Sequence, residues 1–251
     1  MEAIILAAGV GSRLRPLTDR IPKALVEVAG VTMLERVARR VVDAGARRIV
    51  INTHHHAEQI ETFVRGVDGF GVEVRFSRET GEAPLETGGG IKAAADSLEL
   101  NGPVLVHNVD ILTDLPIPSL VDAHDNETIA TLAVADRETR SPILLDDLGV
   151  VGVRYPSGGE RIARAPRGTV REAAFCGISV ISPELPALMT ETGAFSVIPV
   201  YLRLIGDGRH VGAWDAGDVV WTDIGTHEQL AEANRRFAGE RDPGALHPPV
   251  V

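Results

Sequence analysis

Residues 3–18 of the chain read AIILAAGVGSRLRPLT, and PKAL follows at residues 22–25. The run from residue 3 to residue 8 is short and wholly apolar, which is typical of a β-strand buried on both of its faces. Gly9 ends this run, and two prolines further on are incompatible with a regular helix in the segment that follows. The stretch therefore predicts a buried first strand whose carboxyl end opens into a long, glycine-rich and basic loop.

Strand and helix patterns alternate after this loop. The strands expected next are 48–53, 72–76 and 103–107, and the expected helices are 32–44, 57–65 and 87–97. Beyond residue 128 the pattern changes to short strands at 129–135, 143–146, 150–154 and 173–181, with a closing helix at 226–238. Alternation of this kind favours parallel strands covered by helices on both faces. We therefore expect an α/β fold, a Rossmann-like three-layer α/β/α arrangement with a mostly parallel mixed central sheet, in a single domain.

The charge balance and the cysteine content narrow the class of protein. The 251 residues include 25 Lys and Arg against 35 Asp and Glu, so the formal net charge is −10. An acidic chain of this kind is a poor match for the nucleic acid backbone. The apolar run near the amino terminus is too short to span a membrane. Cys176 is the only cysteine, which excludes an intrachain disulfide and suits a reducing compartment. We expect a cytoplasmic protein that binds neither nucleic acid nor a membrane.

The loop after the first strand has the composition of a phosphate-binding segment. Its small residues allow backbone N–H groups to approach an anion closely. Arg13 can donate two hydrogen bonds to phosphate oxygens, and Lys23 adds a mobile positive charge. A dinucleotide-binding fingerprint fits less well, because Leu14 stands where its third glycine belongs. A P-loop is excluded because the loop does not end in Gly-Lys-Ser or Gly-Lys-Thr. A tight turn with solvated basic side chains is the remaining alternative.

The same stretch resembles the signature of the sugar-phosphate nucleotidyltransferases, in its Gly-x-Gly-x-Arg core, its Pro-Leu-Thr end and the Pro-Lys-x-Leu that follows. In that family the Ala-Ala-Gly backbone faces the base and the ribose, and the arginine and lysine hold phosphates. The resemblance implies the same roles in this chain. The nucleotide-binding residues that it implies in this loop are Ala7, Ala8, Gly9, Gly11, Arg13 and Lys23. Arg13 and Lys23 are also implied to be catalytic.

A second glycine cluster, PLETGGGI at residues 84–91, is expected to open a helix beneath a bound ligand. A flexible loop is the alternative. The family has a small-residue segment here that contacts the base, which implies nucleotide-binding roles for Glu86, Thr87 and Gly88. The particular form of the segment resembles the N-acetylmuramate-1-phosphate uridylyltransferase branch, with mannose-1-phosphate guanylyltransferase-like proteins as the nearest competitor.

Two aspartates match the carboxylates with which the family holds its metal ion. Asp110 follows the strand expected at 103–107, and Asp223 stands just before the closing helix. Carboxylates together with phosphate oxygens and water are ligands that Mg²⁺ prefers. The resemblance therefore implies a Mg²⁺ cofactor on these two residues, with a catalytic role for Asp110. It also implies sugar contacts from Asn108 and Gly177.

Several positions depart from the family pattern, mostly on the sugar side. Arg140-Ser141-Pro142 replaces a glycine-rich sugar loop, and Arg154 stands near the place of a sugar-binding glutamate. A second active-site lysine is missing, and Arg161 or Arg164 is the candidate to replace it. The run of histidines at 54–56 lacks the spacing of metal ligands and is expected in a loop near the site. Cys176 is expected to be a small core residue.

These observations predict transfer of a nucleoside monophosphate from an NTP to a sugar 1-phosphate, with release of pyrophosphate. UTP with N-acetylmuramate 1-phosphate is favoured, and GTP with mannose 1-phosphate is the alternative. A non-catalytic nucleotide-binding paralogue and a nicotinamide-dependent dehydrogenase are the alternatives from other classes. The expected partners are these small molecules, and the expected assembly is a monomer or a homodimer. Residues 1–127 are expected to bind the nucleotide and residues 128–240 the sugar, within a domain over 1–240 that precedes a loose tail at 241–251.

Overall fold

The computed structural model describes residues 1–238 of the chain. The strands are β1 Glu2–Leu6, β2 Glu27–Val28, β3 Val31–Thr32, β4 Arg48–Thr53, β5 Glu73–Arg78, β6 Val104–Asn108, β7 Ile111–Thr113, β8 Thr128–Ala135, β9 Ile143–Asp146, β10 Gly149–Arg154, β11 Glu160–Ile162, β12 Arg171–Ile181, β13 His210–Asp215 and β14 Trp221–Asp223. The α-helices are α1 Met33–Asp43, α2 Ala57–Gly66, α3 Glu86–Ala95, α4 Ile117–Asp122, α5 Leu185–Leu188, α6 Val197–Gly206 and α7 His227–Arg236. Short 3₁₀ turns lie at Ser12–Leu14, Leu17–Asp19, Lys23–Leu25 and Asp68–Gly71.

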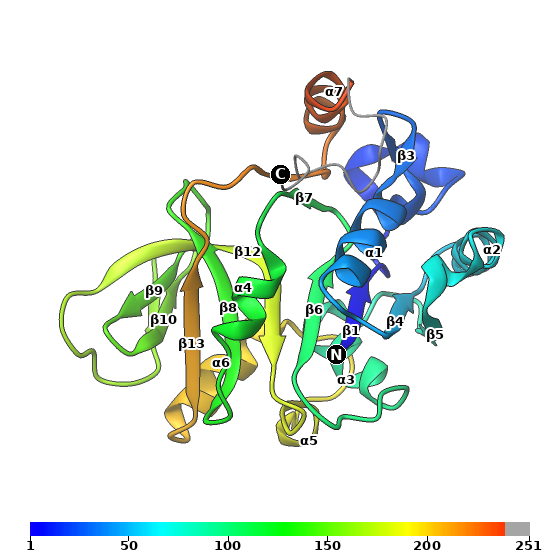
Figure 1. The fold of residues 1–251 in the computed structure, drawn as a ribbon. Coiled ribbons are helices and arrows are strands. Elements are labelled where there is room, and N and C mark those ends of the chain that lie inside the picture. The colour runs from blue at the N-terminus through cyan, green and yellow to red at the C-terminus, as the bar shows by residue number, and fades with distance from the viewer. Residues whose placement is uncertain (239–251) are drawn as a thin grey trace, which may run out of the picture.

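Ten of these strands form one mixed sheet with helices packed against it (Figure 1). The order across the sheet is β11-β10-β9-β12-β6-β1-β4-β5, and β8 pairs with β12 and with β13. The strands β6, β1, β4 and β5 are parallel, whereas β12 is antiparallel to β6, β8 and β9. The expected mixed sheet is therefore confirmed, with its longest parallel run in the first half of the chain.

The register of the parallel strands brings their carboxyl ends to one level. Leu6 at the end of β1 is aligned with Asn52 on β4 and with Asn108 on β6. Because the side chains of a strand alternate between its two faces, β1 contributes to two cores. Ile4 packs into one core with helices α3, α5 and α6, and Ile5 packs into the other with α1, α2 and α4. The expected three layers are thus present, and the ends of the central strands open at a single edge.

Helix α1 shows how local sequence sets an element's bounds. Thr32 caps its amino end, because the Thr32 hydroxyl accepts a hydrogen bond from the Glu35 N–H at 3.2 Å. This Thr-x-x-Glu spacing is typical of a capping box. The helix ends before Gly45, whose φ of +94° is one that residues with a Cβ rarely adopt. The apolar residues between these signals face the sheet, so α1 covers the strands that lead to the loop after β1.

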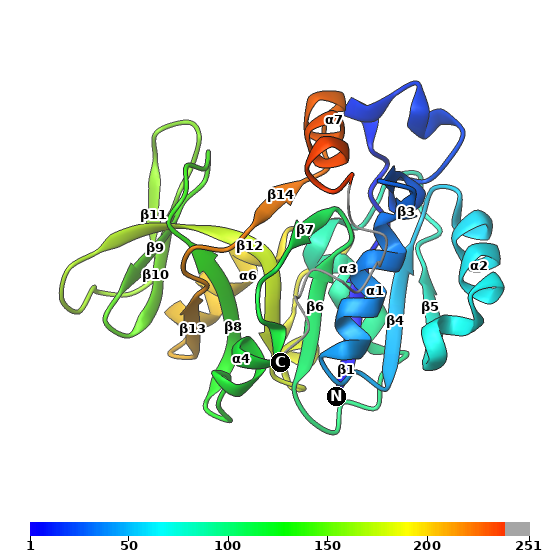
Figure 2. The same cartoon turned by 45° about the horizontal axis from the view of Figure 1, so that its top comes forward.

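A third, smaller core lies outside the sheet and joins the two ends of the described chain. Leu14 in the loop after β1 packs there with Ile224 and with Phe237, and all three are buried. The ladder between β7 and β14 holds the same region from the other side. Figure 2 shows β14 leading into α7, which lies next to the amino-terminal loop. The loop that carries the sequence signature is therefore supported by the last helix.

The predicted elements of the first half lie where the sequence places them, within a few residues. In the second half the predicted strands are confirmed as β8, β9, β10 and β12, and the closing helix as α7. The sequence analysis missed β2, β3, β7, β11, β13, β14, α4, α5 and α6. Helix α6 was missed although its buried residues Val197, Val200, Tyr201, Leu204 and Ile205 recur at helical spacing. Within residues 1–238, none of the helices has both the length and the apolar character needed to cross a bilayer. The tail expected at 241–251 lies outside the described residues.

Candidate active site

A cavity of about 170 Å³ lies at the carboxyl ends of β1, β4 and β6. Its lining residues are Leu6, Ala8, Gly9, Lys23, Asn52, Pro84, Glu86, Thr87, Asn108, Val109 and Asp110. Seven of the candidate site residues from the sequence are in this list. Leu6, Asn52, Pro84 and Val109 were not among the candidates. Ligands of parallel sheets bind beyond the carboxyl ends of the strands, so this cavity has the position of a binding site.

The loop after β1 is folded tightly against its own distal part. Gly11 adopts a φ of +67°, and the Thr18 hydroxyl donates a hydrogen bond to the Gly11 carbonyl at 2.8 Å. A Cβ on Gly11 would stand 2.9 Å from the Thr18 methyl group and 3.1 Å from Cβ of Lys23. Any larger residue at this position would push the two halves of the loop apart. Gly11 thus serves the loop's own packing and positions Lys23 at the cavity.

Lys23 and Asp110 meet at the mouth of the cavity. The Lys23 Nζ lies 2.5 Å from Oδ2 of Asp110, and the lysine side chain is mostly buried. Charge-assisted hydrogen bonds of this kind are stronger than neutral ones. The pair brings the basic loop after β1 into direct contact with the carboxylate that follows β6.

Asp223 lies on the strand segment next to Asp110. In the β7–β14 ladder Asp223 is paired with Ile111, and the Ile224 N–H donates to the Asp110 carbonyl at 2.8 Å. The Gln229 amide nitrogen donates to Oδ1 of Asp223 at 2.5 Å, while its oxygen accepts from the Gly225 N–H. One oxygen of each aspartate, Oδ1 of Asp110 and Oδ2 of Asp223, has no hydrogen-bond donor among residues 1–238. Such oxygens are ligands that a hard divalent cation prefers.

Arg13 also reaches this region. A Cβ built on Gly225 would stand 2.7 Å from Nη2 of Arg13 and 3.2 Å from Oδ2 of Asp223, so the guanidinium group lies over Gly225 beside the carboxylate. The structure therefore brings Arg13, Lys23, Asp110 and Asp223 to one edge of the sheet. In the described part of the chain, no group of three or more His, Cys, Asp or Glu side chains is arranged to hold a metal ion, and this includes the histidines at 54–56.

The second glycine cluster lies at the start of helix α3, as expected. The atoms that pack closest to these glycines belong to the protein itself. A Cβ on Gly88 would stand 2.5 Å from the ring of Phe195, and one on Gly89 would stand 2.8 Å from the Gly193 carbonyl. The space over Gly88 is thus filled by Phe195, and Gly88 does not line the cavity. Glu86 and Thr87 do line it. The Thr87 hydroxyl also accepts from the Val197 N–H at 3.0 Å and so fastens the start of α6.

On the sugar side, Gly177 and Asn108 lie together. Gly177 has a φ of +74°, and a Cβ there would stand 3.0 Å from the Asn108 amide nitrogen. A second open cavity of about 610 Å³ is lined by residues 136–140, 142, 172 and 173. Arg137 is one of these lining residues, and its guanidinium group lies 3.4 Å from the ring centre of Trp221. The sequence analysis singled out neither residue for this role. This contact is a cation–π interaction that fixes the arginine next to the β14 segment.

The arginines considered as substitutes for a second lysine have other partners or positions. Arg164 makes two hydrogen bonds of 2.6 Å to Asp146, and this pairing holds the pKa of Asp146 well below its usual range. Arg161 lies on the exposed edge strand β11. Arg154, which stands near the place of the family's sugar-binding glutamate, forms ion pairs with Glu160 and Glu172. None of the three lines the cavity at the strand ends, which has Lys23 as its only lysine or arginine within residues 1–238.

Two buried groups have strongly shifted pKa values. Burial lowers the pKa of His107 to about 4, so this histidine is neutral inside the sheet. Burial also raises the pKa of the Cys176 thiol to about 11, which leaves it protonated and unreactive. Cys176 is fully buried, and the expectation of a small core residue is confirmed.

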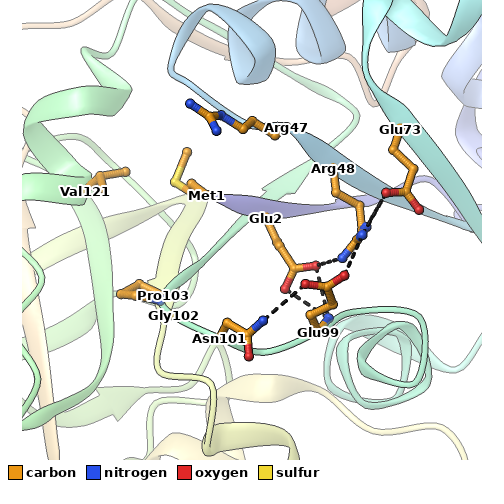
Figure 3. A pocket seen from close by; sticks show the side chains of 10 residues that line it. All are labelled: Met1, Glu2, Arg47, Arg48, Glu73, Glu99, Asn101, Gly102, Pro103 and Val121. Carbon is orange, nitrogen blue, oxygen red and sulfur yellow. Dashed lines mark hydrogen bonds and ion pairs between the residues drawn. The ribbon is translucent and has the colours of Figure 1, made fainter.

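A further cavity of about 480 Å³ lies at the opposite ends of the parallel strands (Figure 3). Its lining includes the first residues of β1, β4 and β5 and the segment just before β6, on the side farthest from the site described above. Arg48 forms ion pairs there with Glu2, Glu73 and Glu99. These ion pairs tie the starts of the strands together, so the cavity has the features of a structural region.

Comparison with known proteins identifies the family. Residues 2–153, more than half of the chain, match the nucleotidyl transferase family. The chain belongs to that family. The nucleotidyl transferase resemblance inferred from the loop after β1 is thereby confirmed, and with it the class of enzyme. Nucleotidyl transferases of this kind generally use a divalent metal ion.

The nucleotidyl transferase relatives include enzymes of nearly the same length. The chain is 33% identical over 242 residues to the N-acetylmuramate alpha-1-phosphate uridylyltransferase of Caulobacter vibrioides, a match that covers 94% of this chain and 96% of the relative. It is 27% identical to the mannose-1-phosphate guanyltransferase of Kluyveromyces lactis, with 98% of this chain and 68% of the relative covered. The fold is shared with a putative glucose-1-phosphate thymidylyltransferase from Bacillus anthracis, at a TM-score of 0.79 and 19% identity over 95% of this chain and 96% of that one.

Proposed function

We propose that this nucleotidyltransferase transfers UMP from UTP to N-acetylmuramate 1-phosphate, giving the UDP-sugar and pyrophosphate. The observation that carries the reaction type is the ion pair of Lys23 and Asp110 at the cavity at the strand ends, with Asp223 on the strand segment beside Asp110 and Arg13 over Gly225. The substrate pair is supported by the uridylyltransferases of Caulobacter vibrioides and Neisseria meningitidis, which match 94% and 93% of this chain.

In this proposal the nucleotide occupies the cavity between the two glycine-rich segments. The backbone of Ala7, Ala8, Gly9 and Gly11 faces the base, ribose and phosphates. Glu86 and Thr87 contact the base from the other wall, and the closely packed Gly88 supports them from behind. This assignment is supported by the lining of the cavity, which includes Ala8, Gly9, Glu86 and Thr87.

The nucleophile is an oxygen of the sugar phosphate and needs no general base. A phosphate monoester is largely dianionic at pH 7, because its second pKa is about 6. This oxygen forms a bond to the α-phosphorus of UTP, and the bond from that phosphorus to the bridging oxygen of the β-phosphate breaks in line. The electron pair of that bond leaves with pyrophosphate. The main barrier is repulsion between two polyanions, which positive charge at the site reduces.

Asp110 and Asp223 are the residues that would hold a divalent ion, for which we propose Mg²⁺. The fit is supported by the free oxygen on each carboxylate. Bound there, the ion would supply positive charge to phosphate oxygens. Lys23 pairs with Asp110, and a cation held by Asp110 would leave the Lys23 ammonium group free to bind a phosphate. Arg13, over Gly225, donates hydrogen bonds to phosphate oxygens and so orients the triphosphate for attack.

The sugar ring is proposed to lie beyond Asp110, in contact with Asn108 and Gly177. The left-handed Gly177 lets the Asn108 amide approach its backbone closely, which places the two residues together at this point. Residues 1–127 would then bind the nucleotide, and the strands from residue 128 onward would bind the sugar. We further propose a cytoplasmic enzyme that works as a monomer or a homodimer. Mannose 1-phosphate with GTP is the second candidate pair, supported by the guanyltransferase relatives.

Pyrophosphate release tests the proposal. The enzyme is incubated with Mg²⁺, one of UTP, GTP, dTTP, CTP or ATP, and one of a panel of sugar 1-phosphates. We expect release with UTP and N-acetylmuramate 1-phosphate that disappears in Asp110→Ala. Asp122→Ala, which removes an exposed carboxylate of α4, serves as the control and keeps full activity. Release only with GTP and mannose 1-phosphate would select the second pair, and no release with any pair would refute the proposed reaction.

A further inference from the structure

A buried glutamate stands directly behind the nucleotide cavity. Glu79, in the loop after β5, is 6% exposed and lies outside the set of residues that line the cavity. Its Oε1 accepts a hydrogen bond from the Asn52 amide nitrogen at 2.7 Å, and its Oε2 accepts one from the Leu85 N–H at 2.7 Å. Its own N–H donates to the Thr53 carbonyl at 2.8 Å. One carboxylate thus joins the end of β4 to the segment that begins α3.

The bond from Glu79 fixes which end of the Asn52 amide faces the cavity. An ionised carboxylate accepts hydrogen bonds and cannot donate them, so the amide nitrogen must point toward Glu79. The amide oxygen therefore points the other way. It lies 3.3 Å from the place where a Cβ on Gly90 would stand, and the same place is 3.2 Å from the side chain of Leu6. The absence of a side chain at Gly90 leaves room for this oxygen.

The Asn52 amide oxygen is an open acceptor at this wall. Asn52 and Leu6 both line the cavity, and the Asn52 amide oxygen receives no hydrogen bond from any residue between 1 and 238. It is not among the buried side-chain atoms without a partner, so water can reach it. A ligand that brings an N–H to this oxygen replaces the hydrogen bond to water, whereas a ligand that brings a lone pair leaves the oxygen unpaired. Uracil, thymine and guanine carry a ring N–H on their hydrogen-bonding edge, whereas cytosine and adenine carry a lone pair at the matching ring nitrogen.

We infer that Glu79 is a positioning residue for base selection, which holds the Asn52 amide so that its oxygen accepts a hydrogen bond from the ring N–H of the nucleobase. Glu79 also fixes Leu85 and with it Glu86 and Thr87 on the opposite wall. The inference rests on the proposed function, because that function is what places the base in this cavity. It holds for UTP and for GTP, because both bases carry that N–H.

A reciprocal exchange of amide and carboxylate tests the inference. In Glu79→Gln, the new amide can satisfy Leu85 with its oxygen only by turning its NH₂ toward Asn52, which must then turn its own oxygen away from the cavity. Asn52→Asp sets two carboxylates against each other. The double variant Glu79→Gln/Asn52→Asp restores both bonds in reversed polarity. The amide at position 79 then donates to the carboxylate at position 52 and still accepts from the Leu85 N–H, and that carboxylate again presents an oxygen to the cavity. The single variants should therefore lose the base preference, and the double variant should regain it.

The dissociation constants of UTP, CTP, GTP and ATP are measured by calorimetry without a sugar phosphate, and KM and kcat are measured where the enzyme turns over. We expect the wild type to prefer UTP to CTP, or GTP to ATP. Glu79→Gln should reduce that ratio about tenfold or more, as expected for one lost hydrogen bond and one unpaired buried group. The loss should fall on the dissociation constant and KM, with kcat at saturation close to wild type. The double variant should regain the preference.

An unchanged base preference in Glu79→Gln would overturn the inference. So would an equal loss of UTP and CTP binding that the double variant does not repair, because that result indicates a purely structural carboxylate. If Glu79→Gln does not fold, Asn52→Ala removes the acceptor oxygen directly, and full retention of the preference there would also overturn it. A wild type that shows the preference but releases no pyrophosphate supports the role of Glu79 and counts only against the proposed reaction.

Discussion

Lys23 and Asp110, which are 87 positions apart in the chain, form an ion pair at 2.5 Å where the loop after β1 meets the end of β6. The pair places a mobile cation on a carboxylate proposed to hold the metal ion. A metal ion on the free Oδ1 of Asp110 and the Lys23 ammonium group on Oδ2 would be two cations on one carboxylate, and they repel each other. Metal binding and release of the lysine toward phosphate are therefore expected to occur together.

Lys23→Ala is expected to lower activity and to strengthen metal binding. The loss of one positive group at the reacting phosphates should reduce kcat by roughly 10²- to 10³-fold. Without its competitor, Asp110 should bind Mn²⁺ more tightly, which can be measured by electron paramagnetic resonance on the free enzyme. Arg15→Ala removes an exposed cation of the same loop and should change neither quantity. Equal Mn²⁺ affinity in Lys23→Ala and wild type would rule out the competition.

Gln229→Ala should weaken the metal site without touching a metal ligand. The Gln229 amide holds Asp223 at 2.5 Å and the Gly225 N–H at 3.1 Å, so its removal frees the carboxylate to rotate. Loss of such a supporting partner typically costs about 10- to 100-fold in metal affinity or activity. We expect lower pyrophosphate release at limiting Mg²⁺ and recovery at high Mg²⁺. The neighbouring exposed residue provides the control Glu228→Ala, and a matching defect there would point to general damage to α7.

Gly177→Ala should raise KM for the sugar phosphate more than it affects KM for the nucleotide. The new Cβ would need a left-handed backbone and would stand 3.0 Å from the Asn108 amide. Gly158→Ala is a matched control, because Gly158 has a φ of +89° but no atom within 4 Å of the added Cβ. The left-handed conformation costs each variant about 1–2 kcal/mol in the free energy of unfolding. A selective change in the sugar KM that appears equally in both variants would disprove the role of Gly177.

His107→Gln should flatten the dependence of stability on pH. The pKa of His107 is about 4 in the folded protein and near 6.5 in the unfolded chain. Between these values the unfolded chain binds the proton and the folded chain does not, so folding becomes less favourable as pH falls through this window. The slope is at most about 1.4 kcal/mol per pH unit. Urea unfolding at several pH values between 4 and 7 measures it, and parallel curves for the two proteins would contradict the expectation.

The sequence predicted the parallel strands β1, β4, β5 and β6 and the helices α1, α2 and α3 because their patterns are short and well bounded, but it did not predict β2, β3, β7 or α4. Thr32 and Gly45 mark the ends of α1 by local chemistry alone. Lys23 and Asp110 were found as candidates because each lies in a recognisable stretch at a strand end. The meeting of strand ends at one edge then follows from parallel topology.

Other parts of the site depend on contacts that sequence patterns do not carry. Glu79 lies in a polar stretch that indicates a surface loop, yet it is buried against Asn52 and Leu85. Gly88 was expected to face a ligand, but the ring of Phe195, over a hundred positions away, fills that space. A glycine allows another group to approach the backbone closely, but the sequence does not tell whether that group is a ligand or another part of the protein. For Gln229 a signal was present, since Thr226-x-x-Gln229 matches a helix capping box.

The small core that joins Leu14 to Ile224 and Phe237 affects how the protein folds during its synthesis. During synthesis Leu14 leaves the ribosome long before Ile224 and Phe237 are translated. A nascent chain can therefore assemble the parallel strands while the loop after β1 still lacks its apolar support. A chain that is terminated before these two residues is expected to keep much of the sheet and to lose nucleotide binding.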